Sequence, residues 1–90
     1  SDTVQTGEWH DYEPMVAGDG PFRVTVSMDA DADLYVKRNG WADVDDYDCR
    51  PYFEGATTET CELQGPGDFY VSINGYDPVT NYQMVIEIAD

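Results

Sequence analysis

The segment from Asp29 to Cys61 carries the most specific patterns of the chain. It reads D-A-D-A-D-L-Y-V-K-R-N-G at positions 29–40, Y-D-C-R-P-Y at 47–52 and T-E-T-C at 58–61. Apolar and polar residues alternate over 33–38, which predicts a short strand. Leu34 and Val36 would point into the core from this strand, and Tyr35 would point outward. The Asn-Gly pair at 39–40 then marks a turn.

Short alternating segments also occupy the rest of the chain. The expected strands span 8–16, 22–28, 33–38, 59–63, 68–74 and 81–88, with Gly- or Pro-containing turns at 17–21, 64–67 and 77–78. The residues expected to share inward faces include Phe22, Val24, Val26, Phe69, Val71 and Ile73. No segment has a helical period. We therefore predict an all-β fold, a single antiparallel β-sandwich over residues 1–90, with 1–7 as a frayed linker end.

The charge of the chain excludes several classes of partner. There are 19 acidic and 4 basic residues, which give a formal net charge of −15. Such a surface repels the phosphate backbone of nucleic acids and anionic membranes, so we expect neither as a partner. No apolar run approaches the roughly 18 residues of a membrane span. We expect a single monomeric domain.

The two cysteines, Cys49 and Cys61, indicate one disulfide and an oxidising compartment. A secreted, extracellular protein is the expectation, and two free thiols in a cytosolic protein are the alternative. His10 is the single histidine, so the chain lacks the soft ligands that a zinc site needs.

Residues suited to catalysis are sparse. Neither G-x-S-x-G nor H-E-x-x-H occurs in the chain. A carboxylate pair can serve as acid and base, but a sandwich of this size uses its strands to enclose a core. We therefore expect a non-catalytic domain, with a stand-alone enzyme as the alternative.

Acidic residues cluster around the predicted strand at 33–38. Asp29, Asp31 and Asp33 alternate with Ala and would place three carboxylates on one side of an extended segment. A hard cation with oxygen ligands, with calcium as the candidate, would relieve their repulsion. The loop acids that could add ligands are Asp43, Asp45, Asp46 and Asp48. The spacing is not that of an EF-hand. The alternative is that these side chains cap turns and strands.

Tyrosine is frequent, with seven in the chain. Tyr35 and Tyr70 fall on the outward phase of their strands, and Trp41 and Tyr76 follow turn residues. Exposed aromatic rings suit the binding of a polymer. We predict that these four residues form a weak binding surface for an insoluble polymer. The alternative is that the rings cover the ends of the sandwich.

The motifs at 31–36, 47–52 and 59–61, with a weaker match over 67–76, resemble the bacterial pre-peptidase C-terminal (PPC) domain. This resemblance implies a jelly-roll-like β-sandwich. It also implies a non-catalytic accessory domain that shares a chain with the catalytic domain of a secreted metallo- or serine peptidase. Such a domain would aid secretion, stability or attachment to insoluble collagen- or chitin-like polymers. The alternative is a purely structural or maturation segment that binds nothing and is removed after export.

Overall fold

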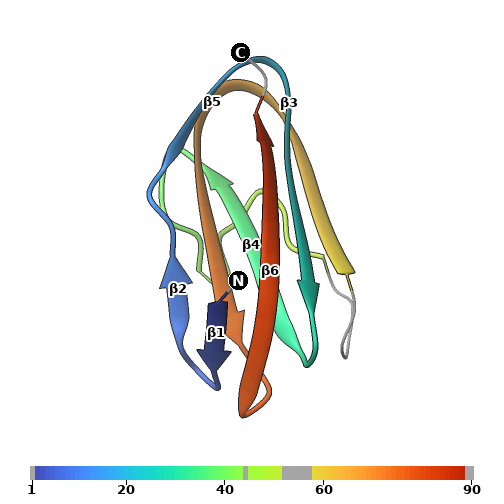
Figure 1. Ribbon diagram of the computed structural model, residues 1–90. Coiled ribbons are helices and arrows are strands. Elements are labelled where there is room, and N and C mark those ends of the chain that lie inside the picture. The colour runs from blue at the N-terminus through green and yellow to red at the C-terminus, as the bar shows by residue number, and fades with distance from the viewer. Residues whose placement is uncertain (1, 44, 52–57, 89–90) are drawn as a thin grey trace.

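Six strands form the sheet of the computed structural model, which describes residues 2–43, 45–51 and 58–88 (Figure 1). They are β1 (Asp2–Gln5), β2 (Trp9–Asp11), β3 (Met15–Met28), β4 (Ala32–Arg38), β5 (Thr58–Gly75) and β6 (Val79–Ile88). The strand order is β1-β6-β3-β5-β2, β4 pairs with β5, and every pairing between these strands is antiparallel. The predicted all-β, antiparallel, sandwich-like fold is confirmed. Within the described residues, no helix has the length and apolarity to cross a membrane.

β5 is the longest strand and connects the two halves of the sheet. Its first half pairs with the second half of β3, and its second half lies between β2 and β4. Ile73, for example, pairs with His10 of β2 on one side and with Leu34 of β4 on the other. Figure 1 shows β3 and β5 curving together at the top of the view. The sheet is therefore strongly bent.

The turns predicted at 17–21 and 64–67 are wrong, because both segments are bends inside continuous strands. The two bends face each other: Gly20 pairs with Gly65, and the register shifts between Ala17 and Gly20. A Cβ atom on Gly65 would lie 2.0 Å from the carbonyl oxygen of Gly18. Glycine permits this close approach, so residues typical of a turn here bend two paired strands.

The core is formed by the inward faces of β3, β4 and β5. Phe22 and Phe69 stack with their ring centroids 4.5 Å apart. The aliphatic side chains that are fully buried around them include Val24, Val26, Leu34, Val36, Val71 and Ile73. The predicted inward phase of these strands is therefore confirmed. Burying an apolar side chain of this size contributes roughly 2 kcal/mol to stability.

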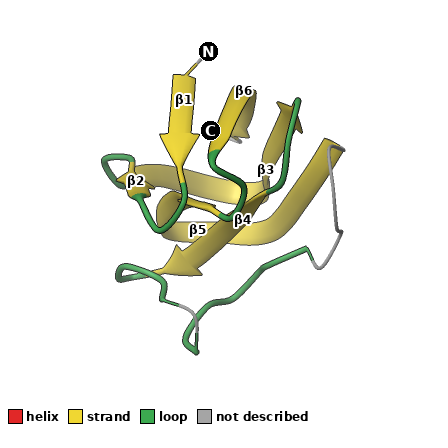
Figure 2. Ribbon diagram, turned by 90° about the horizontal axis from the view of Figure 1, so that it is seen from below, coloured by secondary structure: helices red, strands yellow, loops and turns green. Residues whose placement is uncertain are grey.

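The expected fraying of residues 1–7 is wrong for the described part, because residues 2–5 form β1 along the edge of β6. Val4 is fully buried, and this apolar anchor holds the strand. Beyond β1, Thr6 forms an isolated bridge with Gly75 at the end of β5. β1 therefore connects β6 to β5, and the sheet nearly closes on itself, as the end-on view in Figure 2 shows.

The edge of β4 that faces away from its β5 pairing donates hydrogen bonds to side chains and to a backbone carbonyl, and not to a neighbouring strand. The N–H groups of Leu34, Val36 and Arg38 donate to three different acceptors. In order, these are Oε1 of Glu59 at 3.1 Å, the carbonyl oxygen of Cys49 at 2.9 Å and Oδ2 of Asp48 at 2.6 Å. The predicted disulfide between Cys49 and Cys61 joins this edge to the first half of β5, with a Cα–Cα distance of 5.9 Å. β4 is thus fixed between the two halves of β5.

The near closure of the sheet predicts a sharp difference between two glycine substitutions. A Cβ atom on Gly75 would lie 2.0 Å from the carbonyl oxygen of Gln5, whereas one on Gly40 would meet nothing within 4 Å. Gly75→Ala should therefore lower the free energy of unfolding by about 1–3 kcal/mol, and Gly40→Ala by less than about 0.5 kcal/mol. Urea unfolding of both variants measures the difference. Equal unfolding midpoints for the two would contradict the closure.

Replacing Cys49 and Cys61 together by Ala should lower the free energy of unfolding by about 3 kcal/mol. The disulfide spans a sequence separation of 12, and the entropy of the unfolded chain rises when that loop opens. Urea unfolding of the oxidised parent and the variant measures the change. Coinciding unfolding curves would show that the hydrogen bonds of Val36 with Cys49 hold the β4 edge without the cross-link.

Candidate cation site

Three carboxylates meet where β4 and β5 begin. Asp31 directly precedes β4, Asp33 is its second residue, and Glu59 is the second residue of β5. One oxygen from each lies within 4.8 Å of the others. Because side chains alternate in an extended segment, Asp31 and Asp33 project to the same side. The fold then brings Glu59 against them from a distant part of the sequence.

Glu59 is fully buried. Its Oε1 accepts a hydrogen bond from the Leu34 N–H at 3.1 Å, while its Oε2 has no hydrogen-bond partner among the described residues. Burial raises the pKa of Glu59 to about 7, the negative charges of Asp33 and Asp31 add to this rise, and the Leu34 hydrogen bond opposes it. An orphaned carboxylate oxygen in the interior calls for either a proton or a cation.

Arg50 compensates part of the negative charge. Its Nη2 lies 3.2 Å from Oδ2 of Asp33, and its guanidinium carbon lies 4.9 Å from the ring centroid of Tyr35. When ionised, the three carboxylates together with this guanidinium leave a local charge of −2. One divalent cation would neutralise that charge, and carboxylate oxygens are the ligands that hard divalent cations prefer.

The structure brings together two of the seven predicted ligands, Asp31 and Asp33. Asp29 is directed elsewhere: its carboxylate accepts hydrogen bonds from the backbone N–H and the side-chain amide of Asn81, at 2.8 and 2.9 Å. These bonds lower the pKa of Asp29 below its ordinary value. Asp29 is therefore a cap between β3 and β6, as the alternative interpretation of the acidic residues supposed.

The loop acids also have local roles and do not join the group. Asp43 Oδ1 accepts the backbone N–H of Asp45 at 2.8 Å, Asp46 forms an ion pair with Lys37, and Asp48 caps the N–H of Arg38. Among the described residues, the acids grouped closely enough to share a metal ion are Asp31, Asp33 and Glu59. The structure therefore does not group Asp29 or the described loop acids with Asp31 and Asp33.

Glu59 was missed by the sequence prediction, although the strand phase carried a signal for it. Glu59 and Cys61 are two residues apart in the strand predicted at 59–63, so they share a face. Cys61 was expected in a disulfide, and it is 1% exposed. A glutamate on the same face had to be buried, and a buried glutamate needs a partner.

The predicted aromatic surface is only partly present. Tyr35 lies on the face opposite to Leu34, as its phase predicted, but it is fully buried and not exposed. The reason is that Tyr47 and Arg50, which follow β4 in the chain, pack against the Tyr35 ring on this face of the sheet. Tyr35 packs against Trp9 at 4.9 Å and against Tyr47 at 5.8 Å between ring centroids, which forms a second aromatic cluster outside the main core.

The other three aromatic residues do not form one continuous patch. Trp41 contacts Tyr70 edge-on at 4.7 Å, and 47% of Trp41 remains exposed. Tyr76 is 68% exposed but follows Gly75, which pairs with Ala32 at the start of β4, whereas Trp41 follows the end of β4. Tyr76 and Trp41 therefore lie at opposite ends of this strand.

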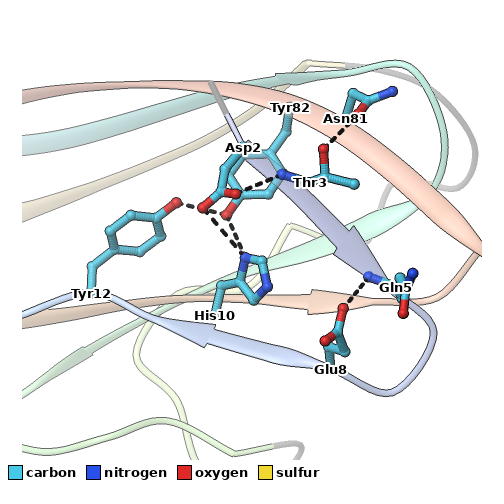
Figure 3. Close-up of polar contacts among 8 residues, drawn as sticks. All are labelled: Asp2, Thr3, Gln5, Glu8, His10, Tyr12, Asn81 and Tyr82. Carbon is cyan, nitrogen blue, oxygen red and sulfur yellow. Dashed lines mark hydrogen bonds and ion pairs between the residues drawn. The ribbon is translucent and has the colours of Figure 1, made fainter.

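A second polar cluster joins β1, β2 and β6 (Figure 3). The Tyr82 hydroxyl lies 2.6 Å from the Tyr12 hydroxyl and 3.1 Å from Nδ1 of His10, and the same nitrogen lies 3.5 Å from Oδ2 of Asp2. Asp2 and Tyr82 contact one nitrogen, so they do not form a relay across the imidazole ring. Burial raises the pKa of Tyr82 and of Tyr12, which keeps both phenols protonated. The geometry is that of a structural connection between strands.

The environment of Glu59 predicts a pH dependence of stability in cation-free buffer. Below its ordinary pKa of 4.5 the residue is protonated in both the folded and the unfolded chain. Between pH 4.5 and about 7 the unfolded chain releases this proton first, so the free energy of unfolding falls as the pH rises, and the loss is complete above pH 7. Thermal unfolding of Glu59→Gln, which keeps an acceptor for Leu34, should lack this component. Parallel stability curves for parent and variant from pH 5 to 8 would contradict it.

No protein-family model, no curated protein and no solved structure matches this chain. The resemblance to the PPC domain therefore stays a prediction that rests on the quoted motifs. The function is argued below from the geometry of the described residues.

Proposed function

We propose that this chain is a non-catalytic β-sandwich module of an extracellular protein, and that a divalent cation bound by Asp31, Asp33 and Glu59 stabilises its fold. The observation that supports this most strongly is the fully buried Glu59, whose Oε2 has no hydrogen-bond partner among the described residues and whose carboxylate converges with two others. A cation would satisfy that oxygen and connect the starts of β4 and β5.

Calcium is the cation that the donors favour. The group offers carboxylate oxygens, and calcium accepts six to eight oxygen ligands in flexible geometry, with water and backbone carbonyls completing the shell. Zinc prefers sulfur and nitrogen ligands, whereas both cysteines form the disulfide and His10 lies in the cluster with Tyr82. Magnesium demands a stricter octahedral arrangement and retains most of its water.

An extracellular location is supported by the disulfide of the chain and fits the proposed calcium site. The Cys49–Cys61 disulfide is a cross-link that persists in oxidising compartments. Calcium sites of moderate affinity are filled in extracellular media, where modules with dissociation constants of roughly 10⁻⁴–10⁻³ M function. The cation and the disulfide then act at the same seam between β4 and β5.

The resemblance to the PPC domain supports a finer proposal. The module would be an accessory domain of a secreted bacterial peptidase that helps to attach the enzyme to an insoluble collagen- or chitin-like polymer and aids secretion and stability. Among the described residues, Trp41 and Tyr76 are aromatic side chains available for such contacts, with 47% and 68% of their surface exposed, and Tyr70 supports Trp41.

Calcium should raise the melting temperature of the parent chain in a concentration-dependent manner. A ligand at 100 times its dissociation constant stabilises the native state by about 2.7 kcal/mol. Glu59→Gln should abolish most of this gain. Asp45→Asn removes one negative charge outside the group and should leave the gain unchanged. Equal calcium responses of the two variants, measured by calorimetry against chelator at matched ionic strength, would place the site elsewhere.

Attachment to a polymer is tested by retention of the purified chain on insoluble collagen and chitin. Trp41→Ala should weaken retention at least about fivefold, because exposed aromatic rings dominate such contacts. Val85→Ala is the matched control, since Val85 is an apolar residue that is 60% exposed on β6. Failure of the parent chain to be retained on either polymer would favour the structural or maturation segment.

A further inference from the structure

A groove of about 410 Å³ lies between β2 and the segment that follows β4. Its described lining comprises Trp9 and Asp11 from β2 and Trp41, Ala42 and Asp43 from the covering segment. Ala42 is 8% exposed and contributes to the floor. Two tryptophans and two aspartates thus line one groove on the outer face of the sheet. The described lining of the groove shares no residue with the candidate cation site.

Both indole rings are held in place by a neighbouring tyrosine. Trp9 packs against Tyr35 with 4.9 Å between ring centroids, and Trp41 contacts Tyr70 edge-on at 4.7 Å with an interplanar angle of 81°. Tyr35 is fully buried, so it gives Trp9 a rigid backing. Walls that are fixed before binding lower the entropic cost of holding a ligand.

The charged side chains in the described lining of the groove, Asp11 and Asp43, are both negative. Asp11 accepts a hydrogen bond from the Ser72 hydroxyl at 2.8 Å, and Asp43 accepts one from the backbone N–H of Asp45 at 2.8 Å. These bonds orient the carboxylates, and each carboxylate can accept several more hydrogen bonds. No positively charged residue belongs to the described lining. The net charge of −15 adds long-range attraction for a basic partner.

A contact of Arg50 indicates which ligand an aromatic ring and a carboxylate can bind together. On the same outer face, the Arg50 guanidinium lies 4.9 Å from the Tyr35 ring centroid and pairs with the Asp33 carboxylate at 3.2 Å. An aromatic face together with a carboxylate therefore already holds a guanidinium next to the groove. Arginine suits such a place better than lysine, because its planar group stacks on rings and donates several hydrogen bonds at once.

We propose that this groove binds an arginine side chain of a basic protein segment. The proposal rests on the attachment role above and deepens it by naming the chemistry of the partner: a protein surface with exposed arginine, and not a neutral polysaccharide. Trp9 and Trp41 stack against the guanidinium and its aliphatic stem, while Asp11 and Asp43 accept its N–H groups.

The test uses tryptophan fluorescence of the full chain in chelator, since the two tryptophans of the sequence both line the groove. The probe is a capped Gly-Arg-Gly-Arg-Gly peptide, and the control probe carries citrulline in place of arginine, which keeps the shape and removes the charge. A saturable fluorescence change is expected with the arginine peptide. The citrulline peptide should bind at least about fivefold more weakly.

Variants of the chain distinguish binding in the groove from attraction by the net negative charge of the chain. Asp11→Asn and Asp43→Asn combined retain acceptors for Ser72 and Asp45 and should weaken binding of the arginine peptide at least about fivefold. Asp19→Asn removes an exposed charge outside the groove lining and should change the dissociation constant by less than about twofold. Calorimetric titration of Trp41→Ala, with its fold checked by circular dichroism, should show the same weakening as the double variant.

Four results would overturn the proposal. Two are equal binding of the arginine and citrulline peptides and equal weakening by Asp19→Asn and the double variant. The third is a response to chitohexaose without one to the arginine peptide, which would leave the attachment role intact and assign the groove to a glycan. The fourth is retention on chitin or collagen with no peptide response, which would remove the arginine site alone. Glu59→Gln should bind the arginine peptide as the parent does, which separates this site from the cation site.

Discussion

The N–H groups of Leu34, Val36 and Arg38 have no strand to donate to on the outer edge of β4. An unpaired edge is costly when it is buried and invites pairing with other chains when it is exposed. Here a glutamate carboxylate, a backbone carbonyl and an aspartate carboxylate accept these three donors. The position of β4, the covering of the outer face and the convergence of the acidic group all follow from this arrangement.

The buried carboxylate that accepts a hydrogen bond from the β4 edge also determines the charge of the acidic group. Oε1 of Glu59 accepts the hydrogen bond from the Leu34 N–H, and Oε2 has no hydrogen-bond partner among the described residues. Burial and two neighbouring aspartates raise its pKa to about 7, so near neutral pH a proton and a cation compete for the same place. A bound cation would restore the ionised form and remove the repulsion among the three carboxylates. Stability would then depend on the ions of the medium.

The sequence alone predicted the features that depend on local alternation. The inward phase of Leu34 and Val36 and the core face of β5 are examples. The pairing of the two cysteines was predicted from their number and not from alternation. The sequence predicts turns at 17–21 and 64–67 where the structure has bends, because glycine and proline are typical of both and the pairing of β3 with β5 distinguishes them. The alternation predicts the correct face for Tyr35 but not its burial, since the residues after β4 that pack against its ring have no periodic pattern.

The acidic group of the candidate cation site was predicted in part for the same reason. Asp31 and Asp33 are neighbours in an extended segment, so their proximity is a local property that the spacing reveals. Glu59 comes close to them through the long-range pairing of strands. The loop acids contact other partners: Asp46 pairs with Lys37, and Asp48 accepts the backbone N–H of Arg38. Tertiary contacts determine which acids converge, and the spacing of acids along the sequence does not reveal those contacts.

If Glu59 completes a cation site with Asp31 and Asp33, an ion should be visible between the three carboxylates. The most direct test is a crystal structure determined from calcium-containing buffer, with anomalous scattering used to locate the ion. We expect an anomalous peak at about 2.3–2.6 Å from a Glu59 oxygen and from oxygens of Asp31 and Asp33. A peak among the acids at 43–48, or no peak near Glu59 in crystals grown at pH 8, would contradict this site.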